Sequence, residues 1–257
     1  MLKFLSVLAA ALLSGCASVA GAGSLADVTV INRSTGERLP LYRHNGRLYV
    51  VGRAGERYAV ELHNRTGARI LTVLSVDGVN AVTGQTAATS QSGYVLDPWG
   101  SADLAGWRKS MRDVAAFYFT ALPDSYAART RRPGNVGVIG VAVYQEYVPP
   151  PPRAQLEAPA MAKSEAAGRL SADSAEAAPS ANAARRPMAE EKLGTGHGER
   201  MYAPTQRTEF RRASSTPSEV IAIYYDSRQN LIAQGVIPRY PNLPQPFPNG
   251  GFVPDPS

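Results

Sequence analysis

Tyr58-Ala-Val-Glu-Leu62 and Ile70-Leu-Thr-Val-Leu-Ser-Val76 lie in the stretch 57–107, which decides the fold of this chain. Each is a short run rich in β-branched or other apolar residues. Runs of this kind, separated by turn residues, are typical of antiparallel strands joined by hairpins. The turns and the later runs of the stretch are Asn64-Arg-Thr-Gly67, Asp77-Gly78, Gly93-Tyr-Val-Leu-Asp-Pro98 and Leu104-Ala-Gly-Trp107.

The same pattern extends on both sides of this stretch. Asn45-Gly46 is a strong hairpin signal, and it separates the apolar runs Leu39–Tyr42 and Arg47–Val51. Pro123–Arg129 has Pro and Asp where a helix would begin, so it predicts one short helix. The further expected strands are Asp27–Asn32, Val114–Thr120 and Val136–Tyr144. The sequence therefore predicts a mostly β, antiparallel, sandwich-like domain over residues 27–148.

The composition changes abruptly at Pro149. Four consecutive prolines open a segment rich in Pro, Ala, Ser and Glu that has almost no large apolar residues. Such a segment cannot bury enough surface to offset its ordering entropy, so we expect a disordered insertion over residues 149–193. As a coil, its ends would lie roughly 35–40 Å apart, which is enough to cross the face of a domain.

Residues 194–238 are expected to complete the domain. Val220–Tyr225 and Leu231–Ile237 predict a β-hairpin, and Glu199–Tyr202 and Gln206–Arg211 are shorter candidate strands. Because the strand Val220–Tyr225 is apolar on both faces, it should join the sheets of residues 27–148 and be covered on both sides. The expected core residues are Ile221, Ile223 and Ile232, and residues 239–257 form a Pro-rich tail. Two separate units joined by a linker are the alternative.

The N-terminus has the features of a targeting segment. Lys3 precedes an apolar run that is too short to span a bilayer, so residues 1–15 are expected to be a signal peptide. The run ends in Leu13-Ser-Gly-Cys16, which resembles the lipobox of bacterial lipoproteins. The resemblance implies that Cys16 is lipidated and becomes the new N-terminus, with residues 16–26 as a lipidated tether. An ordinary secretory signal, cleaved after Cys16, is the alternative.

Localisation follows from the same residues. In the lipoprotein family an Asp after the lipidated cysteine favours the inner membrane, so Ala17 is compatible with the outer one. The expected localisation is the bacterial outer membrane, with the body of the protein facing the periplasm. Cys16 is also the only cysteine, so the mature chain must be stabilised without an internal disulfide.

The net charge of +6 is spread along the chain. Arginines are dispersed among expected turns, and no segment is a concentrated basic patch with interleaved aromatic residues. Nucleic-acid binding requires such a patch, so we do not expect a nucleic-acid partner.

Candidate catalytic and metal-binding residues are few. His197 and Glu199 are the best candidate ligand pair, but a zinc site needs several ligands at regular spacing, so no metal and no cofactor are expected. No Gly-x-Ser-x-Gly elbow is present. Asp77, Asp97 and Asp103 could supply paired carboxylates for glycoside hydrolysis, but turn formation explains their positions as well.

Trp99 and Trp107 are the candidate binding residues. They bracket a segment with mixed charges, and tryptophans beside turns can form a platform for sugar rings or a hot spot for a protein partner. The alternative is that Trp107 plugs the core while Trp99 covers its edge.

Four stretches of the chain are similar to a group of uncharacterised proteobacterial envelope lipoproteins: Val73–Asn80, Gly93–Pro98, Gly106–Ser110 and Phe117–Asp124. This resemblance brings no catalytic residues with it. The leading hypothesis is a non-enzymatic, membrane-anchored envelope lipoprotein that binds another protein or stabilises an assembly. The alternatives are a lipoprotein that binds glycan or peptidoglycan, and a hydrolase with a site that the sequence does not reveal.

Overall fold

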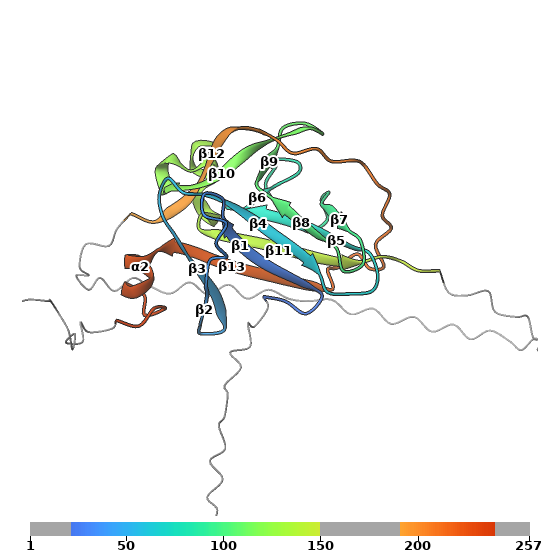
Figure 1. Cartoon of the computed structure of the whole chain (residues 1–257), viewed down its shortest axis with the longest axis horizontal. Coiled ribbons are helices and arrows are strands. Elements are labelled where there is room, and N and C mark those ends of the chain that lie inside the picture. Colours follow the sequence, from blue (N-terminus) through green and yellow to red (C-terminus); the bar gives the residue numbers. More distant parts are fainter. Residues whose placement is uncertain (1–21, 150–190, 240–257) are drawn as a thin grey trace, which may run out of the picture.

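Two β-sheets pack face to face in the computed structural model, which describes residues 22–149 and 191–239 (Figure 1). The first sheet contains β1 (Ala26–Asn32), β4 (Arg57–Asn64), β8 (Ser101–Leu104), β9 (Gly106–Arg108), β10 (Asp113–Ala121) and β12 (Leu193–Tyr202). The second contains β2 (Leu41–His44), β3 (Arg47–Gly52), β5 (Ile70–Val76), β6 (Val79–Asn80), β7 (Tyr94–Leu96), β11 (Val138–Gln145) and β13 (Glu219–Ser227).

The strand order confirms the mostly β, antiparallel fold and adds one parallel contact. The first sheet has the order β1-β4-β10-β12, with β8 paired to β4 and β9 to β10. The second has the order β2-β3-β13-β11-β5-β6, with β7 paired to β5. Every pairing is antiparallel except that of β3 with β13, where Leu48–Gly52 run alongside Ile223–Ser227. The sequence did not predict this parallel pair, because its partners are far apart along the chain.

Several expected elements lie wholly or partly outside the described residues. These are the signal peptide, Cys16, most of the tether, the insertion and the Pro-rich tail. At its C-terminal edge the expected insertion 149–193 overlaps the fold, because β12 already begins at Leu193.

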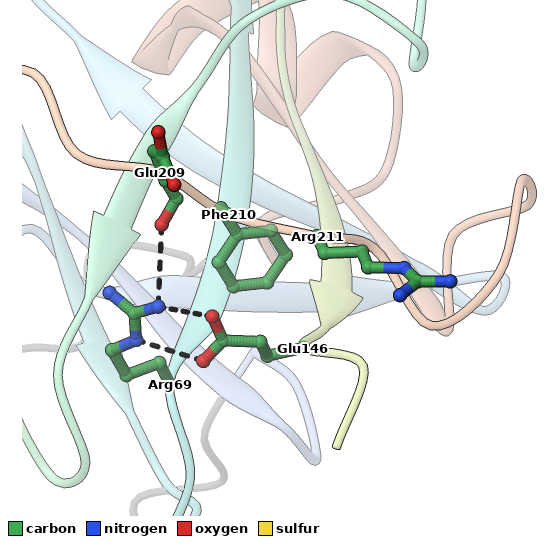
Figure 2. Close-up of a pocket in the computed structure, with 5 residues that line it drawn as sticks. All are labelled: Arg69, Glu146, Glu209, Phe210 and Arg211. Carbon is green, nitrogen blue, oxygen red and sulfur yellow. Dashed lines mark hydrogen bonds and ion pairs between the residues drawn. The ribbon is translucent and has the colours of Figure 1, made fainter. Parts of the chain in front are cut away.

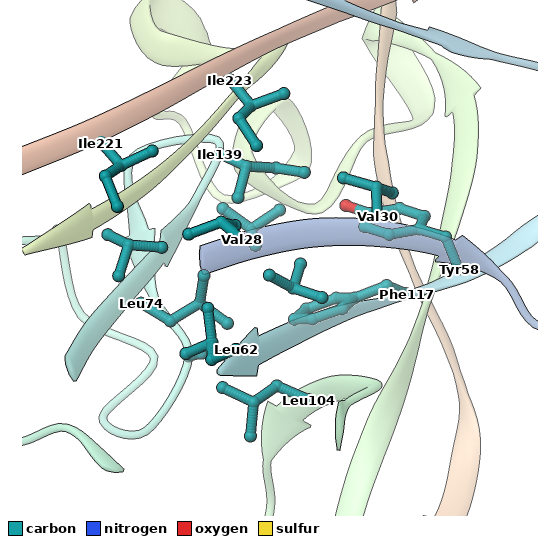
Figure 3. Packing of buried hydrophobic residues seen from close by; sticks show 14 of the residues in the cluster. Val28, Val30, Tyr58, Leu62, Leu74, Leu104, Phe117, Ile139, Ile221 and Ile223 are labelled. Carbon is teal, nitrogen blue, oxygen red and sulfur yellow. The ribbon is translucent and has the colours of Figure 1, made fainter. Parts of the chain in front are cut away.

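The core lies between the two sheets and draws apolar side chains from both (Figure 3). Alternation along the strands selects these residues: β1 buries Ala26, Val28 and Val30, while the residues between them are partly exposed. From the other sheet, Leu74, Ile139 and Ile223 point into the same space.

Turn and helix signals were reliable where their chemistry is local. Asn45 and Gly46 adopt φ angles of 48° and 74°, as a two-residue hairpin turn between β2 and β3 requires. The expected helix at Pro123–Arg129 is present as η1 (Leu122–Asp124) and α1 (Tyr126–Arg129), with the Ser125 hydroxyl accepting a hydrogen bond from the amide of Ala128 at 3.1 Å. A further 3₁₀ turn, η2, spans Pro133–Asn135.

The expected strand Val220–Tyr225 lies within β13, which joins the second sheet between β3 and β11. Ile221, Ile223 and Tyr225 point into the core, as predicted for the two isoleucines. The expectation that both faces are covered was wrong for Val220, which is 64% exposed on the outer face.

The predicted return strand of the C-terminal hairpin was wrong. Residues Arg228–Ala233 form helix α2. Ser227 is its N-cap, because the Ser227 hydroxyl accepts a hydrogen bond from the amide of Asn230 at 3.2 Å. Ile232 is therefore only half-buried, in a small cluster with Leu231 and Ile237 on the outer face of β2 and β3. The predicted strand at Gln206–Arg211 is also absent, and this segment crosses from β12 to β13 as an extended connection.

Substitutions on the two faces of β13 test this arrangement. Ile223→Ala should lower the free energy of unfolding by about 2–5 kcal/mol, because it removes a buried side chain between the sheets. Val220→Ala on the same strand should cost less than about 1 kcal/mol, because this side chain faces solvent. Denaturant unfolding of both variants measures the difference, and equal losses would contradict the assigned facing of the strand.

Candidate functional site at the tether end of the sandwich

The end of the sandwich at which residues 22–26 join it carries the features that best fit a functional surface. We call it the tether end; it also holds the turns 64–68 and 96–100 and the end of β11. The opposite, distal end holds the β3–β4 turn and α2, and lies on the left of Figure 1.

A carboxylate from the second sheet fixes the start of the first. Glu219 accepts hydrogen bonds from the amides of Ser24, Leu25 and Ala26 at 2.6, 2.8 and 3.3 Å. Burial by itself raises the pKa of the Glu219 carboxyl, but these hydrogen bonds together outweigh burial, so the pKa lies below its ordinary value. The point at which the chain joins the fold is therefore held in one place.

Arg65 adds a second attachment at the same point. Its amide donates to the carbonyl of Leu25, and its guanidinium donates to the carbonyl of Gly23, both at 2.9 Å. The turn 64–68 thus lies directly beside the first described residues of the chain.

Asn64 joins that turn to the turn 96–100. It is fully buried, and its amide nitrogen donates to the carbonyls of Ala68 and Asp97 at 2.7 and 2.8 Å. Its side-chain oxygen accepts from the amide of Thr66 at 2.9 Å. The hydrogen bonds of this one buried side chain therefore join the two turns.

Trp99 stands on the turn 96–100. Its side chain is 63% exposed, although its backbone is fixed by a hydrogen bond from its amide to the carbonyl of Thr66 at 3.1 Å. Its φ of 57° places it in the left-handed region, which is unusual for a bulky residue. A large exposed indole on a well-ordered turn is typical of a contact site.

A shallow pocket of about 580 Å³ lies at the same end (Figure 2). Arg69 and Glu146 form a bidentate ion pair along one wall, and the guanidinium of Arg69 also donates to the carbonyl of Glu209 at 3.3 Å. Phe210 packs on the outer face of β5 and β11, and the guanidinium of Arg211 lies 4.0 Å from the centre of the Tyr147 ring. The charges of Arg69 and Glu146 neutralise each other, so this pair adds no net charge to the wall of the pocket.

A second polar cluster lies inside the core, towards the distal end. One oxygen of Asp77 accepts hydrogen bonds from the Tyr225 hydroxyl at 2.5 Å and the Gly137 amide at 2.9 Å, and the other accepts from the Thr195 amide at 2.7 Å. The Thr195 hydroxyl is in turn 2.6 Å from that of Tyr58 and 2.7 Å from that of Tyr225. These residues come from both sheets.

This cluster is closed to substrate. Asp77, Tyr58 and Thr195 have no exposed surface, and Tyr225 is almost as deeply buried. Burial raises the pKa of the Asp77 carboxyl, although its hydrogen bonds act in the opposite direction. Asp97 and Asp103 are exposed elsewhere, so the structure does not bring the three aspartates together as a catalytic pair.

His197 and Glu199 also have separate surroundings. His197 is an exposed residue of β12 that packs near the rings of Trp107 and Tyr126, and partial burial, followed by the charge of Lys109, lowers its pKa. Glu199 pairs with Arg57 at 2.8 Å. Among residues 22–149 and 191–239, no group of three or more His, Cys, Asp or Glu side chains could hold a metal ion.

Packing explains the glycines around His197. A side chain at Gly196 would collide with the ring of Tyr118, and one at Gly194 would collide with Ser125 and Val136. The glycine-rich run is therefore a requirement of β12 lying close to its neighbours.

The two tryptophans do not form a shared platform. Trp107 is 2% exposed and meets the ring of Phe117 edge to face at 4.7 Å between centroids. It fills the core, whereas Trp99 projects from the tether end. Of the two predicted binding residues, only Trp99 is available to a ligand.

Two contacts were missed from the sequence. Asn64 was read only as a turn residue, and its role in joining two turns required knowing that residue 97 lies beside it. Ser101 opens β8 opposite His63, with its hydroxyl 2.8 Å from Nδ1 of that histidine. The side chains of Ser101 and His63 lie on the outer surface of the first sheet rather than in a pocket.

Comparisons with protein-family models, curated proteins and solved structures found no match. Within the part of the chain that the structure describes, no helix is long and apolar enough to cross a membrane.

The two structural carboxylates should respond to pH with opposite signs. Because the folded-state pKa of Glu219 is lowered, its contribution to stability is present above its ordinary pKa and is lost as the pH falls through the folded value. Because the folded-state pKa of Asp77 is raised, its contribution is greatest at low pH and is lost as the pH rises through the folded value.

Denaturant unfolding between pH 3 and 7 tests both signs. The loss of stability in Glu219→Gln, relative to the unmodified chain, should grow towards neutral pH. The loss in Asp77→Asn should shrink, and Asn is a suitable replacement because it tolerates the φ of 53° at this position. Parallel pH dependences for the two variants would show that one of these environments is misassigned.

Proposed function

We propose that this protein is a non-enzymatic envelope lipoprotein, anchored by lipid at Cys16, whose β-sandwich binds another envelope protein or stabilises an assembly. The observation that carries the proposal is the construction of the tether end. Seven to ten residues after Cys16, at residues 23–26, the chain reaches a point that Glu219 and Arg65 hold firmly. Such a short connection is useful to a protein whose body must stay at a membrane.

The lipobox-like sequence Leu13-Ser-Gly-Cys16 supports the anchor. Several acyl chains on one cysteine give stable attachment, whereas a single chain is marginal. Ala17 is compatible with the outer membrane, with the sandwich in the periplasm. In this arrangement the distal end, with the turn Arg53–Glu56 and α2, points away from the anchor and is open to a partner.

The interior polar cluster is not accessible to a substrate. Its titratable groups have no route to substrate, and the hydrogen bonds among them account for their presence by stability alone. The hydrolase alternative therefore has no support from this cluster. The glycan-binding alternative keeps one observation in its favour, the exposed indole of Trp99.

Replacing Cys16 tests the anchor. The unmodified chain should fractionate with membranes at the size of a cleaved, lipidated protein, while Cys16→Ala should give a soluble or uncleaved product. Ser18→Ala, two residues further on, is the matched control and should behave like the unmodified chain. Unchanged membrane retention and mature size in Cys16→Ala would overturn the proposal.

The same strains test the partner. Crosslinking in intact cells should give a discrete adduct with another envelope protein, and the adduct should be lost or weakened in Cys16→Ala, because the chain is no longer held at the membrane. An adduct pattern that is identical in both strains would contradict a partner that depends on the anchor.

A further inference from the structure

A chain of contacts connects the proposed lipid anchor to Trp99. From Cys16 to Ala22 the chain spans at most roughly 20 Å when fully extended. Gly23 and Leu25 then bind Arg65, and Asn64 beside it holds the turn that carries Trp99. Because residues 16–22 limit the reach and hydrogen bonds fix the links from Gly23 onward, a lipid on Cys16 would bring Trp99 close to the surface that holds it.

The position of the indole strengthens this connection. A Cβ atom placed on Gly67 would lie 3.9 Å from Nε1 of Trp99, so the indole extends over the 64–68 turn. The turn leaves the indole exposed beside Gly67 and Ala68, which have little side chain to cover it.

The neighbouring chemistry suits a lipid surface. Arg65 and Arg211 are exposed cations at this end, where the carboxylates of Asp97 and Glu209 are exposed as well, and Val148, which follows β11, is 73% exposed. Tryptophan favours the boundary between headgroups and acyl chains, because its ring is apolar and its N–H can remain hydrated. Arginine beside it attracts anionic headgroups.

We propose that the tether end rests on the membrane that carries the lipid, with Trp99 inserted at the headgroup–acyl boundary. This inference rests on the proposed lipidation of Cys16. It assigns the exposed tryptophan to the membrane rather than to a sugar or a protein partner. A flat sugar site usually offers more than one aromatic surface, and here Trp107 is in the core. The second contact would fix the orientation of the sandwich, which a lipid tether alone leaves free.

Fluorescence of the lipidated, full-length protein in vesicles tests the contact. The chain has two tryptophans, so Trp107→Phe leaves Trp99 as the only reporter. In vesicles of phosphatidylethanolamine and phosphatidylglycerol, its emission should shift to the blue and lose intensity when the acyl chains are brominated. If Trp107→Phe fails to fold, the difference between the unmodified chain and Trp99→Phe gives the same signal, because the buried Trp107 should not be quenched.

A matched control places the reporter at the other end of β4. In a chain with Trp99→Phe and Trp107→Phe, Ala54→Trp puts an indole on the exposed turn between β3 and β4. Strand β4 spans roughly 26 Å for its eight residues, so this reporter should remain unquenched.

Each outcome decides the inference. Quenching at position 99 without quenching at position 54 supports it. Equal emission of Trp99 in brominated and ordinary vesicles, while the chain remains bound, overturns it and leaves the lipid anchor intact. Loss of binding to purified sacculi in Trp99→Ala would also overturn it, because the indole would then serve a glycan. The mass of the vesicle-bound chain reports lipidation separately, so failure of the anchor is recognised independently.

Discussion

The hydrogen bonds of the buried Asp77 carboxylate are the interaction on which the two-sheet structure depends. Burying a carboxylate is costly unless its oxygens are satisfied, and here Tyr225, Thr195 and Gly137 donate to it from three separate segments. Thr195 lies in the first sheet, while Gly137 precedes β11 and Tyr225 lies in β13 of the second. The cluster therefore ties the strands before the insertion to those after it.

The tether end uses the same physical device with a different carboxylate. Glu219, in the second sheet, accepts hydrogen bonds from amides at the start of the first sheet. Asn64 holds two turns together beside it. Polar side chains thus join the two sheets at both ends of the sandwich, while the middle is apolar. The Asp77 cluster towards the distal end is buried and contributes to stability. The hydrogen bonds at the tether end hold exposed groups in place, and for this reason we propose this end as the region that contacts a membrane.

Local sequence chemistry predicted much of the fold, and long-range contacts account for what it missed. Asn45-Gly46 and Ser125 act through neighbouring residues, so their turn and helix were predictable. The apolar run Leu231–Ile237 predicts a strand, because its spacing does not reveal that Ser227 starts a helix. The different environments of Trp99 and Trp107 depend on which sheet face each segment meets, and short runs do not carry that information.

Native-state hydrogen exchange of the Thr195 and Gly137 amides tests most directly the claim that the Asp77 cluster joins the two sheets. Both amides donate to Asp77, so both should exchange only through global unfolding, with the same free energy as denaturant unfolding. Exchange of either amide at a free energy well below that of global unfolding would show that the cluster opens while the rest of the fold stays intact, and would contradict its central role.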